Sequence, residues 1–282
     1  MEPFGARLER AMAERGRFCL GLDPHPGLLR DWGLSDDAAG LERFTLTMVA
    51  AVGDVVAVLK PQSAFFERHG SAGIAVLERT IVAARSAGAL VLLDVKRGDI
   101  GSTAQAYADA YLDPSSSLAY DAVTASPFLG IGALDPIIDA ALLHRAGVFV
   151  LALTSNPEGR FVQQARAASG TTVAGEILSA IAGRNAATTS LGSIGAVVGA
   201  TIGSTNENLE VNGPLLVPGI GAQGGTLADL PRIFRGAVRN VLPSSSRALL
   251  RGGLSTAALR QAVAETVGEA DSLLGRPDCP RA

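Results

Sequence analysis

Eight stretches of mostly apolar residues recur along the chain, each of strand length and each ending in or near a polar residue. Longer segments rich in Ala, Leu, Ile, Glu and Arg, a composition typical of helices, lie between several of them. The predicted strands are residues 18–23, 55–60, 90–96, 121–126, 148–155, 194–201, 215–221 and 238–244. The predicted helices are residues 72–87, 103–112, 135–145, 173–185 and 256–274.

The apolar runs are nearly continuous instead of alternating, which indicates strands covered on both faces, as in a parallel sheet with helices outside. Eight β then α units of this length predict an α/β fold, a closed (β/α)8 TIM barrel. We expect one domain over residues 1–282, with a core at about 18–274 and a frayed tail at 275–282. A doubly wound open sheet is the alternative, but DPHPG follows the first strand and no GxGxxG opens a helix there.

Composition narrows the class of protein. Hydrophobic residues make up 48% and charged residues 18%, which excludes a disordered chain. The net charge of −3 gives no basic excess for a nucleic-acid partner, and no apolar run approaches the roughly 18 residues of a membrane span. A charged amino-terminal segment without an apolar core favours a cytoplasmic location. Cys19 and Cys279 form no disulfide framework, and His25, His69 and His144 lack metal-ligand spacing.

Charged residues terminate the first three predicted strands. In such a barrel the site lies at the carboxyl ends of the strands, so Asp23, Lys60, Asp94 and Lys96 are candidates, with Asp99 in the loop beyond. Asp94 and Lys96 are two apart and should share one face. Removing such charges from water costs several kcal/mol per ion, so a fold without a use for them would rarely place them at these strand ends. Structural alternatives are an ion-pair lattice, a turn cap at Asp23 and a Lys60 that extends to solvent.

Glycine-rich sequence follows the seventh strand in LLVPGIGAQGG, and Arg247 follows the eighth in VLPSSSRALL. Loops at these positions of a barrel often bind phosphate, because glycines let backbone N–H groups approach an oxyanion. Gln223 would add an amide donor and Arg247 a fixed cation. We therefore predict a phosphorylated ligand, against the alternative of a tight loop with a surface arginine. The glycines concerned are Gly219, Gly221, Gly224 and Gly225.

The motif D-x-K-x-x-D-I-x-x-T, here Asp94, Lys96, Asp99, Ile100 and Thr103, together with PGIGAQGG, resembles orotidine 5′-phosphate decarboxylase. LGLDPHP, KPQSAFFE, TASPFLG and LTSNPEG are similar to the longer bacterial branch of that family, and the resemblance runs over residues 18–247. It implies a TIM-barrel homodimer that converts orotidine 5′-phosphate to uridine 5′-phosphate and carbon dioxide in pyrimidine nucleotide synthesis. It also implies that neither a metal nor an organic cofactor takes part.

The resemblance also implies roles for individual residues. Lys96 would protonate ring carbon 6, Asp94 would lie beside the departing carboxylate, and Lys60 and Asp23 would contact the ribose. Asp99 and Thr103 would reach the site of the partner subunit. Ser155 would bind the pyrimidine edge, with Thr154 adjacent, while Gln223, Gly224 and Arg247 would bind the phosphate. Where the shorter branch has a glycine before the phosphate arginine, this chain has Ser246.

Other functions on the same frame stay open from the residues alone. One is a Schiff-base aldolase that uses Lys96 or Lys60, and another is a magnesium-dependent sugar-phosphate decarboxylase with the same D-x-K-x-x-D strand. A third is a nucleotide-binding barrel without catalysis, which has little use for a cation between two carboxylates.

Overall fold

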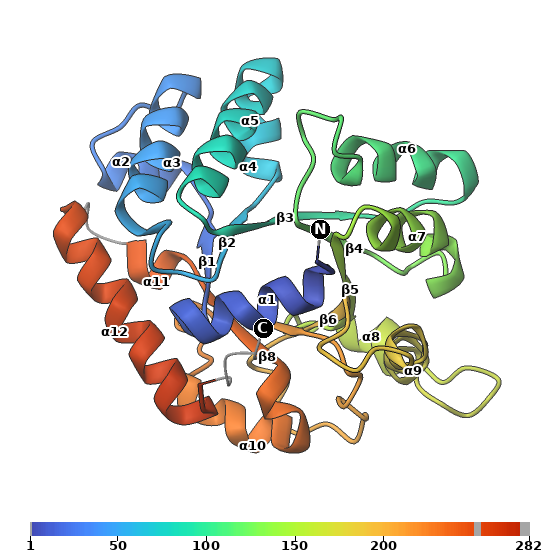
Figure 1. The fold of residues 1–282 in the computed structure, drawn as a ribbon. Helices are drawn as coiled ribbons and strands as arrows, with labels where there is room; N and C mark the ends of the chain where they lie inside the picture. The colour runs from blue at the N-terminus through green and yellow to red at the C-terminus, as the bar shows by residue number, and fades with distance from the viewer. Residues whose placement is uncertain (1, 251–254, 277–282) are drawn as a thin grey trace.

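Eight parallel strands form a closed barrel in the computed structural model, which describes residues 2–250 and 255–276. The strands pair in chain order and β8 pairs with β1, so the sheet has no edge (Figure 1). All eight predicted strands are confirmed, with bounds that differ by a few residues. They are β1 (Cys19–Leu22), β2 (Val58–Pro61), β3 (Leu90–Arg97), β4 (Ala122–Ala125), β5 (Gly147–Leu153), β6 (Ile194–Val198), β7 (Leu215–Pro218) and β8 (Val241–Ser245).

Helices surround the ring of strands, and all five predicted ones are present. These are α5 (Gly70–Ser86), α6 (Gly101–Leu112), α7 (Asp135–Leu143), α9 (Val173–Asn185) and α12 (Thr256–Leu274). The sequence analysis missed α1 (Phe4–Arg15), α2 (Pro26–Asp31), α3 (Ala38–Val52), α4 (Ala64–Glu67), α8 (Gly159–Gln163), α10 (Leu230–Phe234) and α11 (Arg247–Leu250). It also missed the short 3-10 helices η1 (Ile131–Leu134), η2 (Leu227–Asp229) and η3 (Arg235–Asn240). Among the described residues, no helix is both long and apolar enough to cross a membrane.

The interior of the barrel is a packed layer of side chains. Each of the eight strands contributes a buried residue to one apolar cluster, which fills the inside of the barrel. These residues are Cys19, Val58, Leu92, Ala122, Phe149, Val197, Leu216 and Leu242. A larger apolar cluster lies between the strands and the surrounding helices. Both faces of every strand are therefore covered, which is why the strands appear in the sequence as continuous apolar runs.

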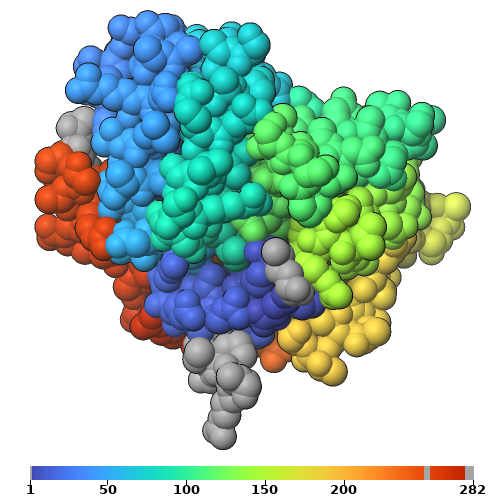
Figure 2. Space-filling model, turned by 45° about the horizontal axis from the view of Figure 1, so that its top comes forward, coloured from blue at the N-terminus to red at the C-terminus, as the bar shows by residue number. Residues whose placement is uncertain are grey.

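Helix α1 closes the amino-terminal end of the barrel. Phe4, Leu8 and Met12 follow one another at intervals of four, on one face of the helix, and are at most 1% exposed. Phe4 packs edge-on against Phe149 of the interior layer, with ring centroids 6.0 Å apart. Figure 2 shows α1, in blue, across the centre of this face of the molecule. The carboxyl-terminal ends of the strands lie at the opposite end of the barrel, which α1 leaves uncovered.

The predicted frayed tail over residues 275–282 falls largely outside the described residues, as does Cys279. Within that range Arg276 is described, and its guanidinium donates to the main-chain oxygens of Ala13 and Glu14 near the end of α1.

Candidate active site

A cavity of about 500 Å³ opens at the carboxyl-terminal end of the barrel, where the polar residues that terminate the strands come together. Seven of the ten predicted site residues line it, contributed by six strands or the loops after them. They are Asp23, Lys60, Asp94, Lys96, Ser155, Gln223 and Arg247. The prediction that these side chains converge is confirmed.

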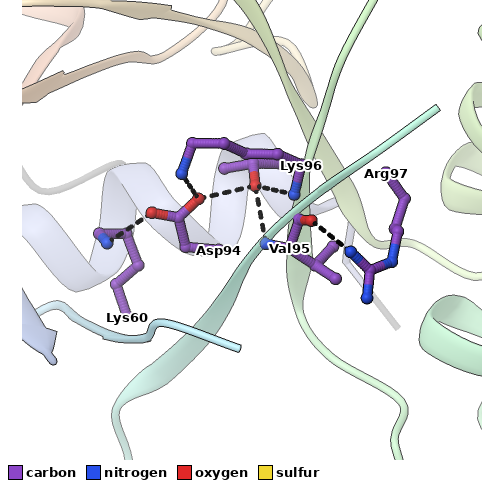
Figure 3. A network of polar contacts seen from close by, with 6 residues as sticks. Lys60, Asp94, Val95, Lys96 and Arg97 are labelled. Carbon is purple, nitrogen blue, oxygen red and sulfur yellow. Dashed lines mark hydrogen bonds and ion pairs between the residues drawn. The ribbon is translucent and has the colours of Figure 1, made fainter. Parts of the chain in front are cut away.

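The centre of the cavity is an ionic network of two lysines around one carboxylate (Figure 3). Lys60 Nζ lies 2.9 Å from Asp94 Oδ2, and Lys96 Nζ lies 2.5 Å from Asp94 Oδ1. The Lys60 and Asp94 side chains are 7% and 11% exposed, whereas the Lys96 side chain is 44% exposed. Lys96 is thus the most exposed member of the network.

The network keeps its charges at neutral pH. Burial alone would raise the pKa of the Asp94 carboxyl, but the charges of Lys60 and Lys96 outweigh it and hold that pKa well below its ordinary value of 3.8. Burial would likewise lower the pKa of Lys60, but Asp94 and then Asp23 raise it above its ordinary 10.5. Lys60 and Asp94 each stabilise the ionised form of the other, so this pair carries fixed charges and does not share a proton as a neutral pair.

Lys96 reaches the network from an irregular point of its strand. The register between β3 and β4 shifts between Leu93 and Arg97, and Lys96 has a positive φ of 47°. The sequence analysis expected Asp94 and Lys96 on one face of a regular strand; their side chains do meet, but through a bulge. A β-bulge redirects a side chain, and positive φ is uncommon outside glycine. The bulge turns the Lys96 amine back onto Asp94.

Ser155 and Gln223 join the loops after β5 and β7 across the mouth of the barrel. The Ser155 hydroxyl donates to Gln223 Oε1 at 2.7 Å. The neighbouring Thr154 hydroxyl is engaged within its own loop, because it donates to Asn156 Oδ1 and accepts from Gln163 Nε2. Both residues line the cavity, but the Ser155 hydroxyl bonds to a second loop across the barrel mouth, whereas the Thr154 hydroxyl is engaged within its own loop.

A smaller hollow of about 70 Å³ adjoins the cavity and shares Asp23, Lys60, Gln223 and Arg247 with it. The loops after β7 and β8 form its walls. Three glycine N–H groups that were expected to face a phosphate donate instead within the loop, from Gly221 to Gly225, from Gly224 to Gly221 and from Gly225 to Gly219. The side chains of Gln223 and Arg247 are among the donors that line this hollow.

Three predicted site residues do not line this cavity: Asp99, Thr103 and Gly224. Asp99 lies just before α6 and its carboxylate accepts from the Ile100 N–H at 2.8 Å. Thr103 is exposed in the first turn of α6. Gly224 is exposed with a φ of 85°, a conformation that glycine adopts without strain.

The cavity lining also includes residues that the sequence analysis did not name as site candidates, among them His25, Gln62, Phe65 and Thr124. His25 caps α2, accepting from the Leu28 N–H through Nδ1. Gln62, with its amide oriented to satisfy its neighbours, donates to the Asp94 carboxylate and main-chain oxygen. The available signal was their position immediately after a strand-end charge, in DPHP and KPQ, or on a strand, in VTAS.

Lysine is rare in this chain, since the sequence holds two lysines against 22 arginines. Both lysines are in the network, so every other basic side chain is a guanidinium or an imidazole. Arginine does not give up its proton in proteins, whereas a lysine amine can.

Residues 2–250 and 255–276 contain no group of three or more His, Cys, Asp or Glu side chains placed to hold a metal ion.

The model of the orotidine 5′-phosphate decarboxylase / HUMPS family matches residues 16–262. Among curated proteins, an orotidine 5′-phosphate decarboxylase of a Nocardioides species is 66% identical over 254 residues, which cover 89% of this chain and 93% of the relative. The protein of the same name from Salinispora arenicola is 61% identical over 275 residues, covering 97% of this chain and 99% of the relative.

A solved structure from Streptomyces avermitilis, assigned as an orotidine 5′-phosphate decarboxylase, superposes with a TM-score of 0.95 at 57% identity. The match covers 97% of this chain and 96% of that one. The similarity therefore extends over the whole barrel and includes every strand that contributes to the cavity.

Proposed function

The chain belongs to the orotidine 5′-phosphate decarboxylase / HUMPS family, and from this membership we propose how its cavity converts orotidine 5′-phosphate to uridine 5′-phosphate and carbon dioxide. Lys96 supplies the proton, Asp94 holds Lys96 and lies beside the departing carboxylate, and Gln223 with Arg247 binds the phosphate. The observation that carries this assignment is the Lys60–Asp94–Lys96 network at the mouth of the barrel.

Lys96 acts on the carbanion that decarboxylation leaves. The bond between ring carbon 6 and the carboxylate breaks, its electron pair stays on the ring carbon, and the Lys96 ammonium donates the proton that replaces carbon dioxide. The pair has little resonance relief, so the site must favour negative charge there more strongly in the transition state than in the substrate. A cation that touches the reacting carbon does this first by attraction and then by proton transfer.

Asp94 fixes the place of that cation. Its carboxylate is ionised at neutral pH, accepts from both lysines and leaves Lys96 as the more exposed partner. A substrate carboxylate placed next to Asp94 meets a like charge, and this repulsion disappears as carbon dioxide leaves. Stabilisation of the transition state by Lys96 carries the larger part of the catalysis in this proposal, because the network is organised before substrate binds.

The phosphate takes the smaller hollow between the loops after β7 and β8. Gln223 and Arg247 line both this hollow and the main cavity, so one ligand can span the two. Asp23 and Lys60 lie between them, where ribose hydroxyls would be. Binding energy from a phosphate remote from the ring can be used to order loops and exclude water, so it contributes to the rate as well as to affinity.

The test follows the loss of the orotidine ultraviolet absorbance with EDTA present, for the parent protein and for Lys96→Ala. We expect the parent to turn over and the variant to lose about 10²-fold or more, the usual contribution of a positioned general acid. Arg184→Ala is the matched control, because its guanidinium pairs with Asp135 on the surrounding helices and lies outside the cavity lining. A Lys96→Ala rate within about tenfold of the parent contradicts the assignment.

A homodimer in which Asp99 and Thr103 complete the partner's site is the second part of the proposal. Both residues lie at the start of α6, outside the cavity of their own chain. Large apolar side chains are exposed beside Asp99 and in the loop after β4, where Ile100 is 62%, Phe128 77% and Leu129 54% exposed. Apolar side chains clustered on a surface favour an interface between proteins, and a symmetric pair buries the same patch twice.

Subunit complementation tests this arrangement. Lys96→Ala and Asp99→Ala dimers should each be nearly inactive, but a mixed dimer contains one site with both native residues. Dissociating and remixing equal amounts should restore about a quarter of the parent activity, since half the dimers are mixed and each has one complete site. A monomer by light scattering, or no recovery in the mixture, contradicts a shared site.

The alternatives give different results in the same assays. In an aldolase, borohydride would trap a sugar phosphate on Lys60 or Lys96, and a magnesium-dependent enzyme would lose its activity in EDTA.

A cytoplasmic location stays a prediction from the sequence, and cell fractionation would test it.

A further inference from the structure

Thr124 lies on β4 beneath the ionic network and is 1% exposed. Its hydroxyl donates to Asp94 Oδ1 at 2.9 Å and accepts the main-chain N–H groups of Val95 at 3.0 Å and Lys96 at 2.9 Å. Figure 3 shows Asp94, Val95 and Lys96, the three residues that this hydroxyl contacts, close together at the network. One side chain therefore connects the carboxylate of the network with the backbone of its proton donor.

The direction of these hydrogen bonds is fixed. A threonine hydroxyl has one proton to donate and two lone pairs to accept with. The two N–H groups can only donate, so they take both lone pairs, and the proton is left for Asp94. The hydroxyl thus always presents a donor to the carboxylate, and Asp94 Oδ1 receives Thr124 on one side and Lys96 on the other.

The same hydroxyl holds the bulge of β3 in place. Lys96 has a φ of 47°, a conformation that costs a non-glycine residue about 1–3 kcal/mol and persists only where the surroundings impose it. The two amides that Thr124 accepts belong to Lys96 and to the residue before it. Arg97 adds a bond from its guanidinium to the Val95 carbonyl at 3.3 Å. The residues that direct the Lys96 amine into the cavity are therefore tied down from β4.

We propose that Thr124 is a positioning residue of the decarboxylation: its hydroxyl sets the orientation of the Asp94 carboxylate and the bulged backbone that aims Lys96 at the reacting carbon. This role rests on the proposed function of Asp94 and Lys96. Threonine suits it better than serine, because branching at Cβ restricts the rotamer that points the hydroxyl toward β3. Thr124 itself need not touch the reacting atoms.

Thr124→Val tests the proposal, because valine keeps the shape and removes the hydroxyl. We expect kcat to fall about 10²-fold, the usual cost of displacing a catalytic group by 1 Å. The dissociation constant of uridine 5′-phosphate should change less than about threefold, because the side chains proposed to bind its phosphate and ribose do not contact Thr124. Thr124→Ser, which restores the hydroxyl, should recover kcat to within about fivefold of the parent. If Thr124→Val does not fold, Thr124→Ala replaces it, since the space left can admit a water for the two amides.

Thr80→Val is the matched control. Thr80 is also fully buried, and its hydroxyl donates to the Val76 carbonyl in α5, away from the cavity. Its replacement should affect stability but leave kcat unchanged. Because the chain has two lysines, protein labelled with ¹³C-lysine gives two side-chain signals that report directly on the network. The Lys96 signal should shift in Thr124→Val and stay in place in Thr80→Val.

A folded Thr124→Val protein with kcat within about threefold of the parent, or a Thr124→Ser protein as slow as Thr124→Val, overturns the role. A parent protein that does not decarboxylate orotidine 5′-phosphate overturns the proposed function and this role with it. An active parent with an unaffected Thr124→Val variant overturns the role of Thr124 alone.

Discussion

Replacing Asp94 by asparagine should destabilise the fold as well as disable the site. Lys60 Nζ is 2.9 Å from the Asp94 carboxylate, and its side chain is 7% exposed. Asparagine keeps the volume of the side chain and removes its charge. The buried ammonium then retains the charge of Asp23, which also raises the pKa of Lys60. A buried cation without its ion pair is unfavourable in a low-dielectric interior.

The size of the effect follows from the burial of the pair. Removing one partner of a buried ion pair costs about 3–5 kcal/mol of unfolding free energy, and the remaining field of Asp23 places the expected loss near the lower figure, about 3 kcal/mol. Glu42→Gln is a matched control, because the Glu42–Arg79 pair is close, at 2.5 Å, but its side chains are 35% and 50% exposed. An exposed pair contributes about 1 kcal/mol or less.

Urea unfolding followed by circular dichroism at neutral pH measures both free energies of unfolding. The double variant Asp94→Asn with Lys60→Met should regain much of the loss, because an apolar side chain in place of the buried ammonium removes the unpaired charge. An Asp94→Asn protein no less stable than Glu42→Gln would refute the reasoning. It would mean that water already solvates the Lys60 ammonium, or that the Lys60 side chain moves to a solvated position.

Three further predictions concern pH, the phosphate and the closed end of the barrel. The lysines outweigh burial and hold the pKa of Asp94 below 3.8, so the stability that the parent gains over Asp94→Asn is fully present above that pH and is lost as pH falls below it. Urea titrations of both proteins at about pH 6 and about pH 3 measure this change, and a difference that grows in acid would contradict the sign. Arg247→Ala should lower kcat/KM for orotidine 5′-phosphate by about tenfold or more but leave that for phosphate-free orotidine unchanged, since only the nucleotide reaches the guanidinium. Met12→Ala should cost about 2–5 kcal/mol in urea unfolding with kcat unaffected, because Met12 is 1% exposed at the end of the barrel opposite the cavity.

Much of the fold could be predicted from the sequence because both faces of each strand are buried. Such strands appear as uninterrupted apolar runs, and all eight were located; α9 and α12 were predicted with their observed bounds. Helix α1 was missed although Phe4, Leu8 and Met12 carry an amphipathic pattern, because the intervening charges dominate the segment. What makes that face apolar is a contact with Phe149, and periodicity does not show which distant residue a face will meet.

For the site, the sequence determined which residue types end each strand, and barrel closure brings strand ends together whatever the details of packing. Only the tertiary structure decided that Lys60 and Lys96 share one carboxylate, that Lys96 reaches it through a bulge with positive φ, and that the Thr124 hydroxyl supports both from below. Apart from the contact between Asp94 and Lys96, these contacts join residues 28 to 34 positions apart in the sequence. Alternation along a strand shows which face a side chain occupies, whereas hydrogen-bond distances across strands depend on register, bulge and twist, which are set when the whole barrel packs.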